Sequence, residues 1–132
     1  MNFGKLQRRW STQKPPVYDK ETRIVCLDIK AEQQKDMDGN TQDGYSYIPV
    51  EIDRQIDYGH IKSQLIEKGF AQKDEFGLVM NAMGDLLKAA KASSSWDDFI
   101  KAAKTEDILA FEDFVEFRQV CADAAKEVLK SY

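Results

Sequence analysis

The spacing of apolar residues changes once along this chain of 132 residues, near Asp53. Before Asp53, apolar and polar residues alternate at positions 24–29 and 48–52, which is the period of strands with one buried face. After it, apolar residues recur every three or four positions, as in amphipathic helices. Strands followed by helices predict an α+β domain over residues 22–132. We expect an N-terminal β-hairpin, residues 22–53, packed against three to four helices within residues 57–131.

The segment between the two predicted strands resembles a calcium-binding loop, because Asp36 and Asp38 stand at alternate positions, as calcium ligands do in such loops. An EF-hand loop that starts at Asp36 needs glycine at its sixth position and glutamate at its twelfth. This chain has Thr41 and Tyr47 there. Two Asp-Gly pairs in the same segment are typical of hairpin turns. We therefore predict a turn at this place, with no metal and no cofactor.

The first predicted helix has the most detailed end signals. Asp57 is placed to cap its start, and Gly69 stands where a left-handed residue commonly ends a helix. Phe70 would then fold back onto Leu65. The apolar side of this helix is formed by Tyr58, Ile61, Leu65 and Ile66.

Three further helices are predicted after residue 72. In the first, at about 73–92, Gly77 and Gly84 mark either close helix packing or a break into two segments. Ser95 and Thr105 are placed to cap the other two, of which the last ends near Leu129. The apolar positions are Phe76, Val79, Met80, Met83, Leu87 and Ala90 in the first of these helices; Trp96, Phe99, Ile100 and Ala103 in the second; and Phe111, Phe114, Phe117, Cys121, Ala125 and Val128 in the third. We expect the four positions of the second helix to form its buried side.

The N-terminal segment is basic although the whole chain carries a net charge of −4. Residues 1–23 contain six basic and two acidic residues, and the rest of the chain is correspondingly acidic. Residues 1–21 lack the period of a long helix and contain Pro15-Pro16, which predicts an extended basic arm. Aromatic and arginine side chains anchor many interfaces. The arm residues predicted to bind a partner are Phe3, Leu6, Arg8, Arg9 and Trp10; a solvated, partly disordered terminus is the alternative interpretation.

The sequence favours few kinds of chemistry. Cys26 and Cys121 are far apart in the sequence, and two buried thiols are favoured over the one disulfide that they could form. His60 is the only histidine, so any Ser-His-Asp or Cys-His site can draw on one imidazole. No phosphate-binding, zinc-protease or nucleophile-elbow motif occurs. We therefore predict no enzyme and no catalytic residue, with a small hydrolase or metal-dependent enzyme as the weakest of three hypotheses.

Three stretches carry a resemblance to a known group of proteins: YSYIPVEI, IDYGHIKSQLIEKGFAQKDEFGLVMNAM and FEDFVEFRQVCADAAKEVL. They resemble small uncharacterised proteins encoded in tailed-phage and prophage gene clusters of gut anaerobes. The resemblance covers residues 45–83 and 111–129, and residues 84–109 depart from it. It implies a virion or virion-assembly protein. The matching positions are Tyr47, Pro49 to Ile52, Tyr58, Ile61, Ser63 to Ile66, Asp74, Glu75, Asn81, Phe114, Phe117, Arg118, Cys121, Ala125 and Lys126.

Taken together, these features predict a structural or interaction protein of a phage particle or its assembly. It would dock an exposed apolar patch and the arm onto a protein partner, either a larger assembly or further copies of itself. The alternative is an accessory protein that binds nucleic acid through the basic arm. No stretch has the roughly 18 apolar residues of a membrane helix, and the N-terminus lacks the apolar run of a secretory signal. We expect no membrane contact and a place in the host cytoplasm or the virion.

Overall fold

The computed structural model describes all 132 residues. Strands occupy its N-terminal part and helices the remainder, so the predicted α+β fold and its four helices are confirmed. The strands are β1 (Arg9–Ser11), β2 (Tyr18–Asp19), β3 (Ile24–Ala31), β4 (Gln34–Lys35), β5 (Thr41–Gln42) and β6 (Tyr45–Glu51). The helices are α1 (Tyr58–Gly69), α2 (Gln72–Ala92), α3 (Trp96–Ala102) and α4 (Glu106–Leu129).

The main sheet is antiparallel with the strand order β1-β6-β3-β2, and its centre is the predicted hairpin of β3 and β6. Strands β4 and β5 form a separate two-stranded ribbon at the tip of this hairpin. The register of β3 against β6 shifts between Leu27 and Lys30, where Asp28 adopts a positive φ of 48°. Val25 and Leu27 are therefore buried as their alternation predicts, whereas Ile29, beyond the bulge, is only half-buried.

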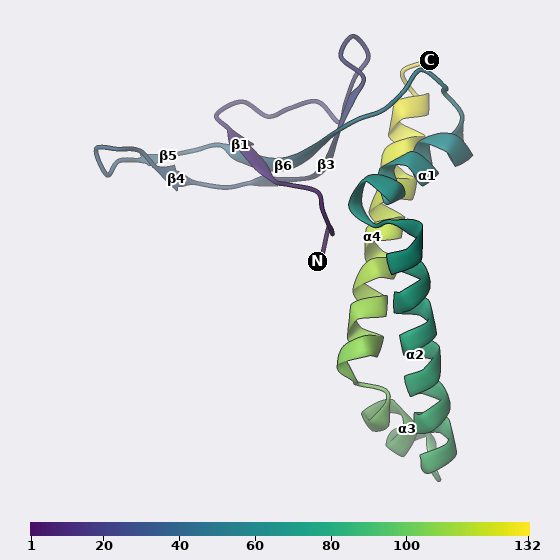
Figure 1. Ribbon diagram of the computed structural model, residues 1–132. Helices are drawn as coiled ribbons and strands as arrows, with labels where there is room; N and C mark the ends of the chain where they lie inside the picture. The colour runs from purple at the N-terminus through teal and green to yellow at the C-terminus, as the bar shows by residue number, and fades with distance from the viewer.

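The core lies between one face of the sheet, α1 and the C-terminal half of α4 (Figure 1). Its aromatic centre comprises Phe70, Phe114 and Phe117, whose ring centroids lie 5.0–6.4 Å apart. None of the core residues comes from α2 or α3. The core consists of Val25, Leu27, Ile48, Val50, Ile52, Ile61, Leu65, Ile66, Phe70, Phe114, Phe117, Cys121, Ala124, Ala125 and Val128.

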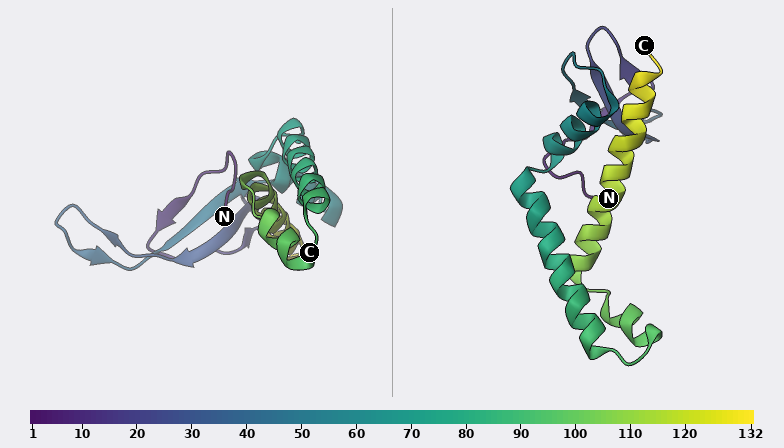
Figure 2. Two further views of the ribbon diagram at one scale, coloured as in Figure 1. Left: turned by 90° about the horizontal axis from the view of Figure 1, so that it is seen from below. Right: turned by 90° about the vertical axis from the view of Figure 1, so that its right-hand side faces the viewer.

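Helix α2 and the N-terminal half of α4 form a long helical hairpin that extends away from the sheet (Figure 1). The short helix α3 lies at its far end, and the two further views show the same arrangement (Figure 2). α2 runs without a break, which settles the question left open at Gly77 and Gly84. A Cβ atom at either glycine would meet open space, so neither glycine is required for packing within this chain.

Three predicted helix starts are confirmed. The Asp57 side chain accepts a hydrogen bond from the His60 amide at the start of α1. The Ser95 hydroxyl accepts one from the Asp98 amide, and the Thr105 hydroxyl accepts one from the Ile108 amide. Each bond satisfies an amide that the first turn of a helix leaves without a partner.

The predicted end of α1 is wrong in its mechanism. Gly69 is helical and has no positive φ, and the chain leaves the helix in an extended conformation at Phe70. Glycine is needed here for space. A Cβ at Gly69 would lie 2.8 Å from Cζ of Phe117 and 3.0 Å from the carbonyl oxygen of Phe3. Glycine is required at position 69, but the reason is the close packing of another segment on the helix end and not a left-handed backbone conformation.

The two cysteines are free and buried, as predicted. Burial raises the pKa of the Cys121 thiol to about 12, and burial likewise raises the pKa of Cys26. Both thiols therefore behave as small apolar groups. No helix combines the length and the apolar character needed to cross a membrane.

Candidate interaction surfaces

The N-terminal segment, predicted as an arm, is extended but lies against the body of the protein. The ring of Phe3 meets the ring of Phe117 edge-on, with centroids 5.7 Å apart, and Leu6 packs against the same core. The Lys5 amide donates a 2.8 Å hydrogen bond to the Gly69 carbonyl. The two apolar residues predicted to bind a partner are thus used within the chain, and no helix forms over residues 3–10.

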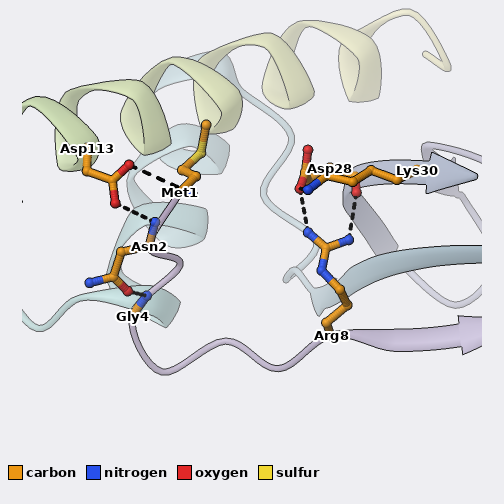
Figure 3. Close-up of polar contacts among 7 residues, drawn as sticks. All are labelled: Met1, Asn2, Gly4, Arg8, Asp28, Lys30 and Asp113. Carbon is orange, nitrogen blue, oxygen red and sulfur yellow. Dashed lines mark hydrogen bonds and ion pairs between the residues drawn. The ribbon is translucent and has the colours of Figure 1, made fainter. Parts of the chain in front are cut away.

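The beginning of the chain is also held on α4 by polar contacts. The Asn2 amide donates a 2.6 Å hydrogen bond to Oδ2 of Asp113, and the terminal amino group lies 4.0 Å from Oδ1 of the same residue (Figure 3). The Asn2 side chain in turn accepts a hydrogen bond from the Gly4 amide at 2.8 Å. These contacts join the first residues to a helix more than one hundred positions away in sequence.

Arg8 connects the same segment to the sheet. Its Nη1 donates a 3.0 Å hydrogen bond to the Asp28 carbonyl, and its Nη2 pairs with the Asp28 carboxylate (Figure 3). Nη1 also donates a 3.0 Å hydrogen bond to the Ser46 hydroxyl. The same carboxylate lies 3.2 Å from Nζ of Lys30. Ser46 is the one buried polar residue of the chain, and Arg8 supplies its hydrogen bond. The charge of Arg8 is therefore compensated internally by the bulge in β3.

The remaining two predicted residues differ in exposure. Trp10 is half-buried; its Nε1 donates a 2.8 Å hydrogen bond to the Glu32 carbonyl, and its ring lies over Gly44. A Cβ at Gly44 would come within 2.3 Å of that ring. Arg9 is exposed on β1, opposite Tyr47 of β6. Of the five predicted partner-binding residues, only Arg9 presents an uncompensated side chain to solvent.

His60 lies in a network with two acids at the start of α1. Its Nε2 is 2.7 Å from Oδ2 of Asp53, and its backbone amide donates a hydrogen bond to Oδ1 of Asp57, the capping residue of α1. The hydrogen bond from the His60 ring lowers the pKa of Asp53, and the backbone hydrogen bond from His60 lowers the pKa of Asp57. No group of three or more His, Cys, Asp or Glu side chains is arranged to hold a metal ion. This network stabilises the loop that leads into α1.

An unpartnered apolar surface lies on α2. Its residues Phe76, Met80, Met83 and Leu87, which we call the α2 stripe, are 66%, 49%, 59% and 57% exposed. The sequence predicted them as one apolar face of the helix. α2 has 21 residues but buries only Ala82 and Ala89. The helix thus packs through these alanines and the half-buried Leu78 and Leu86, and presents the four residues of the α2 stripe to solvent.

Contacts with α4 fix this rotation of α2. Near the start of α2, Glu75 accepts a 2.7 Å hydrogen bond from Nη1 of Arg118. Further along, Asp85 accepts a 2.6 Å hydrogen bond from the Thr105 hydroxyl. The buried Ala82 lies between these positions in sequence and on the same side of the helix. Turning the α2 stripe inward would break both polar contacts.

A shallow groove of about 650 Å³ extends the α2 stripe toward α3. Phe99 of α3 closes one side of it, and the ring of Trp96 lies 5.6 Å from that of Phe99. Trp96 is 72% exposed and Ile100 is 40% exposed, so the prediction that they form the buried side of α3 is wrong. α3 buries no residue, because it lies beyond the end of the core. The groove is lined by Met80, Met83, Gly84, Leu86, Leu87, Ala90 and Phe99.

Comparison of the chain with protein-family models, curated proteins and solved structures found no match. Function is therefore inferred from the surfaces of this chain.

Proposed function

We propose that this chain is a non-enzymatic interaction protein that docks through the α2 stripe and the adjoining groove. One observation carries this proposal: a 21-residue helix buries only two alanines and holds four large apolar side chains in solvent. Monomeric proteins seldom expose a contiguous apolar surface of this kind, and where they do it usually marks a binding site.

The energetics favour a covered stripe. Complete burial of a Phe, Met or Leu side chain contributes about 1.5–3 kcal/mol relative to full exposure. Each residue of the α2 stripe is about half exposed or more, so a partner that covers all four gains several kcal/mol from them. Phe76 and Trp96 add the aromatic anchors that dominate many interfaces.

The stripe is also held ready for binding. The contacts of Glu75 with Arg118 and of Asp85 with Thr105 fix α2 on α4 before any partner arrives. A surface that is already ordered loses little conformational entropy on association. In this proposal the α2 stripe takes the role that the sequence assigned to the N-terminal arm, since Phe3 and Leu6 are half-buried and pack against the core.

Site-specific photo-crosslinking in cells tests the proposal. A photoreactive phenylalanine analogue at Leu87 is expected to give covalent adducts of higher mass on illumination. The same analogue at Val115, which is 47% exposed on α4, is the matched control and should give none. Equal labelling from the two positions, or no adduct from Leu87, would contradict a docking role for the stripe.

The phage setting implied by the sequence resemblance has its own test. If the chain serves in a virion or its assembly, capsid or tail genes are expected on either side of its gene. Genes of unrelated metabolism there would count against this setting, while leaving the docking surface unaffected.

The sequence-based alternative, nucleic-acid binding by the basic segment, stays a prediction. Lys5, Arg9, Lys14 and Lys20 form no ion pair and are the cations available for it, whereas Arg8 is paired with Asp28. Replacing Arg9 and Lys14 by alanine should then weaken DNA binding and reduce its dependence on salt. DNA binding unchanged by this double replacement would contradict the alternative.

A further inference from the structure

The residues of the α2 stripe follow the spacing of a helix that pairs with another helix. Phe76, Met80, Met83 and Leu87 are separated by four, three and four positions, and Ala90 continues the series. This is the a/d repeat of a coiled-coil seam, in which apolar side chains recur every 3.5 residues on average. Within this chain only Phe99 of α3 borders that seam, toward its Leu87 end, because α4 contacts α2 on the side of Ala82 and Ala89. The seam therefore lacks a helix of matching pattern.

The stripe is complementary to itself when two copies run antiparallel. In that orientation each a position faces a d position, so Phe76 of one copy lies against Leu87 of the other, and Met80 against Met83. All four layers are then apolar. Phe76 of the other copy would lie at the groove that Leu87, Ala90 and Phe99 line.

The shape of the surface favours the same orientation. The groove is lined by residues from Met80 to Ala90, toward the Leu87 end of the α2 stripe, and the ring of Phe76 lies at the other end. In an antiparallel pair each Phe76 therefore meets the groove of the other copy. In a parallel pair Phe76 would face Phe76, and the two grooves would face each other with no side chain to fill them.

The area is close to what a stable dimer needs. The four residues of the α2 stripe and Trp96 are between 49% and 72% exposed. At roughly 200 Å² for a whole large apolar side chain, they present on the order of 600 Å². A standard interface buries about 800 Å² on each partner, including its polar rim.

We infer that the α2 stripe binds the α2 stripe of a second copy of this chain, in antiparallel orientation. The inference rests on the proposed function, because it names the occupant of that docking surface. The pairing is isologous: a two-fold axis passes between Met80 and Met83 of the two helices, and both copies use the same residues.

Sedimentation equilibrium of the purified full chain tests this inference. Twice the mass of one 15.1 kDa chain is expected at micromolar concentrations. Met83→Glu should weaken the dimer on the order of a hundredfold, because pairing would bury two carboxylates beside the two-fold axis. Val115→Glu is the matched control on α4 and should remain dimeric. Both sites are exposed, so both variants are expected to keep the wild-type circular dichroism spectrum.

Cysteine cross-linking tests the orientation. The Phe76→Cys/Leu87→Cys double variant should form a disulfide between copies, whereas Phe76→Cys alone should not. In the antiparallel pair the two Phe76 positions are roughly 16 Å apart along the helix axes, beyond the reach of a disulfide. A monomeric wild-type chain, a dimeric Met83→Glu variant, or efficient linking by Phe76→Cys alone would each overturn the inference. The proposed function would still stand if the photo-crosslinker at Leu87 captured a different polypeptide.

Discussion

Arg118 of α4 donates a 2.7 Å hydrogen bond to the carboxylate of Glu75 in the first turn of α2. Both side chains keep part of their surface in water, 40% for Arg118 and 26% for Glu75. The pair therefore contributes little to the free energy of unfolding, and its main effect is to orient α2 on α4. It holds α2 in the rotation that presents its large apolar side chains outward.

Replacing either member of this pair should lower stability only slightly. We expect Glu75→Ala and Arg118→Ala each to reduce the free energy of unfolding by about 0.5–1 kcal/mol, because solvent screens a partly exposed ion pair. Urea denaturation of both single variants and the double variant gives the coupling energy. Strictly additive losses would show that the two side chains do not interact in solution.

Arg8 should matter much more. Arg8→Ala is expected to cost about 1.5–3 kcal/mol, since it removes a charge-assisted contact and leaves the buried Ser46 hydroxyl without its partner. Arg9→Ala is the matched control: Arg9 is exposed, and its replacement should change stability by less than about 0.5 kcal/mol. Equal effects of the two replacements in urea denaturation would argue against a docked N-terminal segment.

Two glycines of α1 should respond in opposite directions to alanine. Gly69→Ala is expected to destabilise by about 1–3 kcal/mol, because the new methyl group would press on Phe117 and on the Phe3 carbonyl. Gly59→Ala should stabilise by about 0.5–1 kcal/mol, since its Cβ meets nothing nearer than 3.8 Å and alanine favours the helix. Thermal unfolding measures both, and a stable Gly69→Ala variant would refute the close packing at the end of α1.

The loop before α1 should lose stability in acid. The hydrogen bonds from His60 lower the pKa values of Asp53 and Asp57 in the folded state. A lowered folded pKa gives stability that is present above the unfolded pKa, near 3.9, and is lost as the pH falls through the folded value. As the pH drops below about 4, the urea concentration at the unfolding midpoint should therefore decrease. It should decrease less steeply in the Asp53→Asn/Asp57→Asn variant. Identical pH profiles for the variant and the wild type would contradict a role of these two carboxylates in the loss of stability in acid.

The two thiols should be inert in the native protein. Cys26 and Cys121 are buried, and burial raises the pKa of each. A thiol reagent at pH 8 is expected to label neither until urea unfolds the chain, and then to label both. Rapid labelling of either residue under native conditions would contradict the burial and would also complicate cross-linking through introduced cysteines.

The sequence predicted the elements with long, regular patterns and missed those without them. Alternation found β3 and β6, and side-chain chemistry found the caps at Asp57, Ser95 and Thr105. β1 and β2 have three and two residues, too few to show a period, and they exist only because the hairpin offers them edges. Their pairing is a tertiary effect that local sequence does not encode.

The candidate site was half predicted for a similar reason. Periodicity located Phe76, Met80, Met83 and Leu87 on one face of a helix, but it cannot tell whether the same chain covers that face. That depends on the alanines Ala82 and Ala89, which give α2 a second, flatter face for α4. In the N-terminal segment the error ran the other way, because Phe3 and Leu6 find room against Gly69 and Phe117 within the chain.

The helical hairpin of α2 and α4 reaches away from the sheet, which lies toward the end where α2 begins (Figure 1). A two-fold axis at the middle of α2 therefore sets the two sheets at opposite poles of an elongated particle. The 21 residues of α2 span about 30 Å. Such a particle has two identical ends that face away from each other.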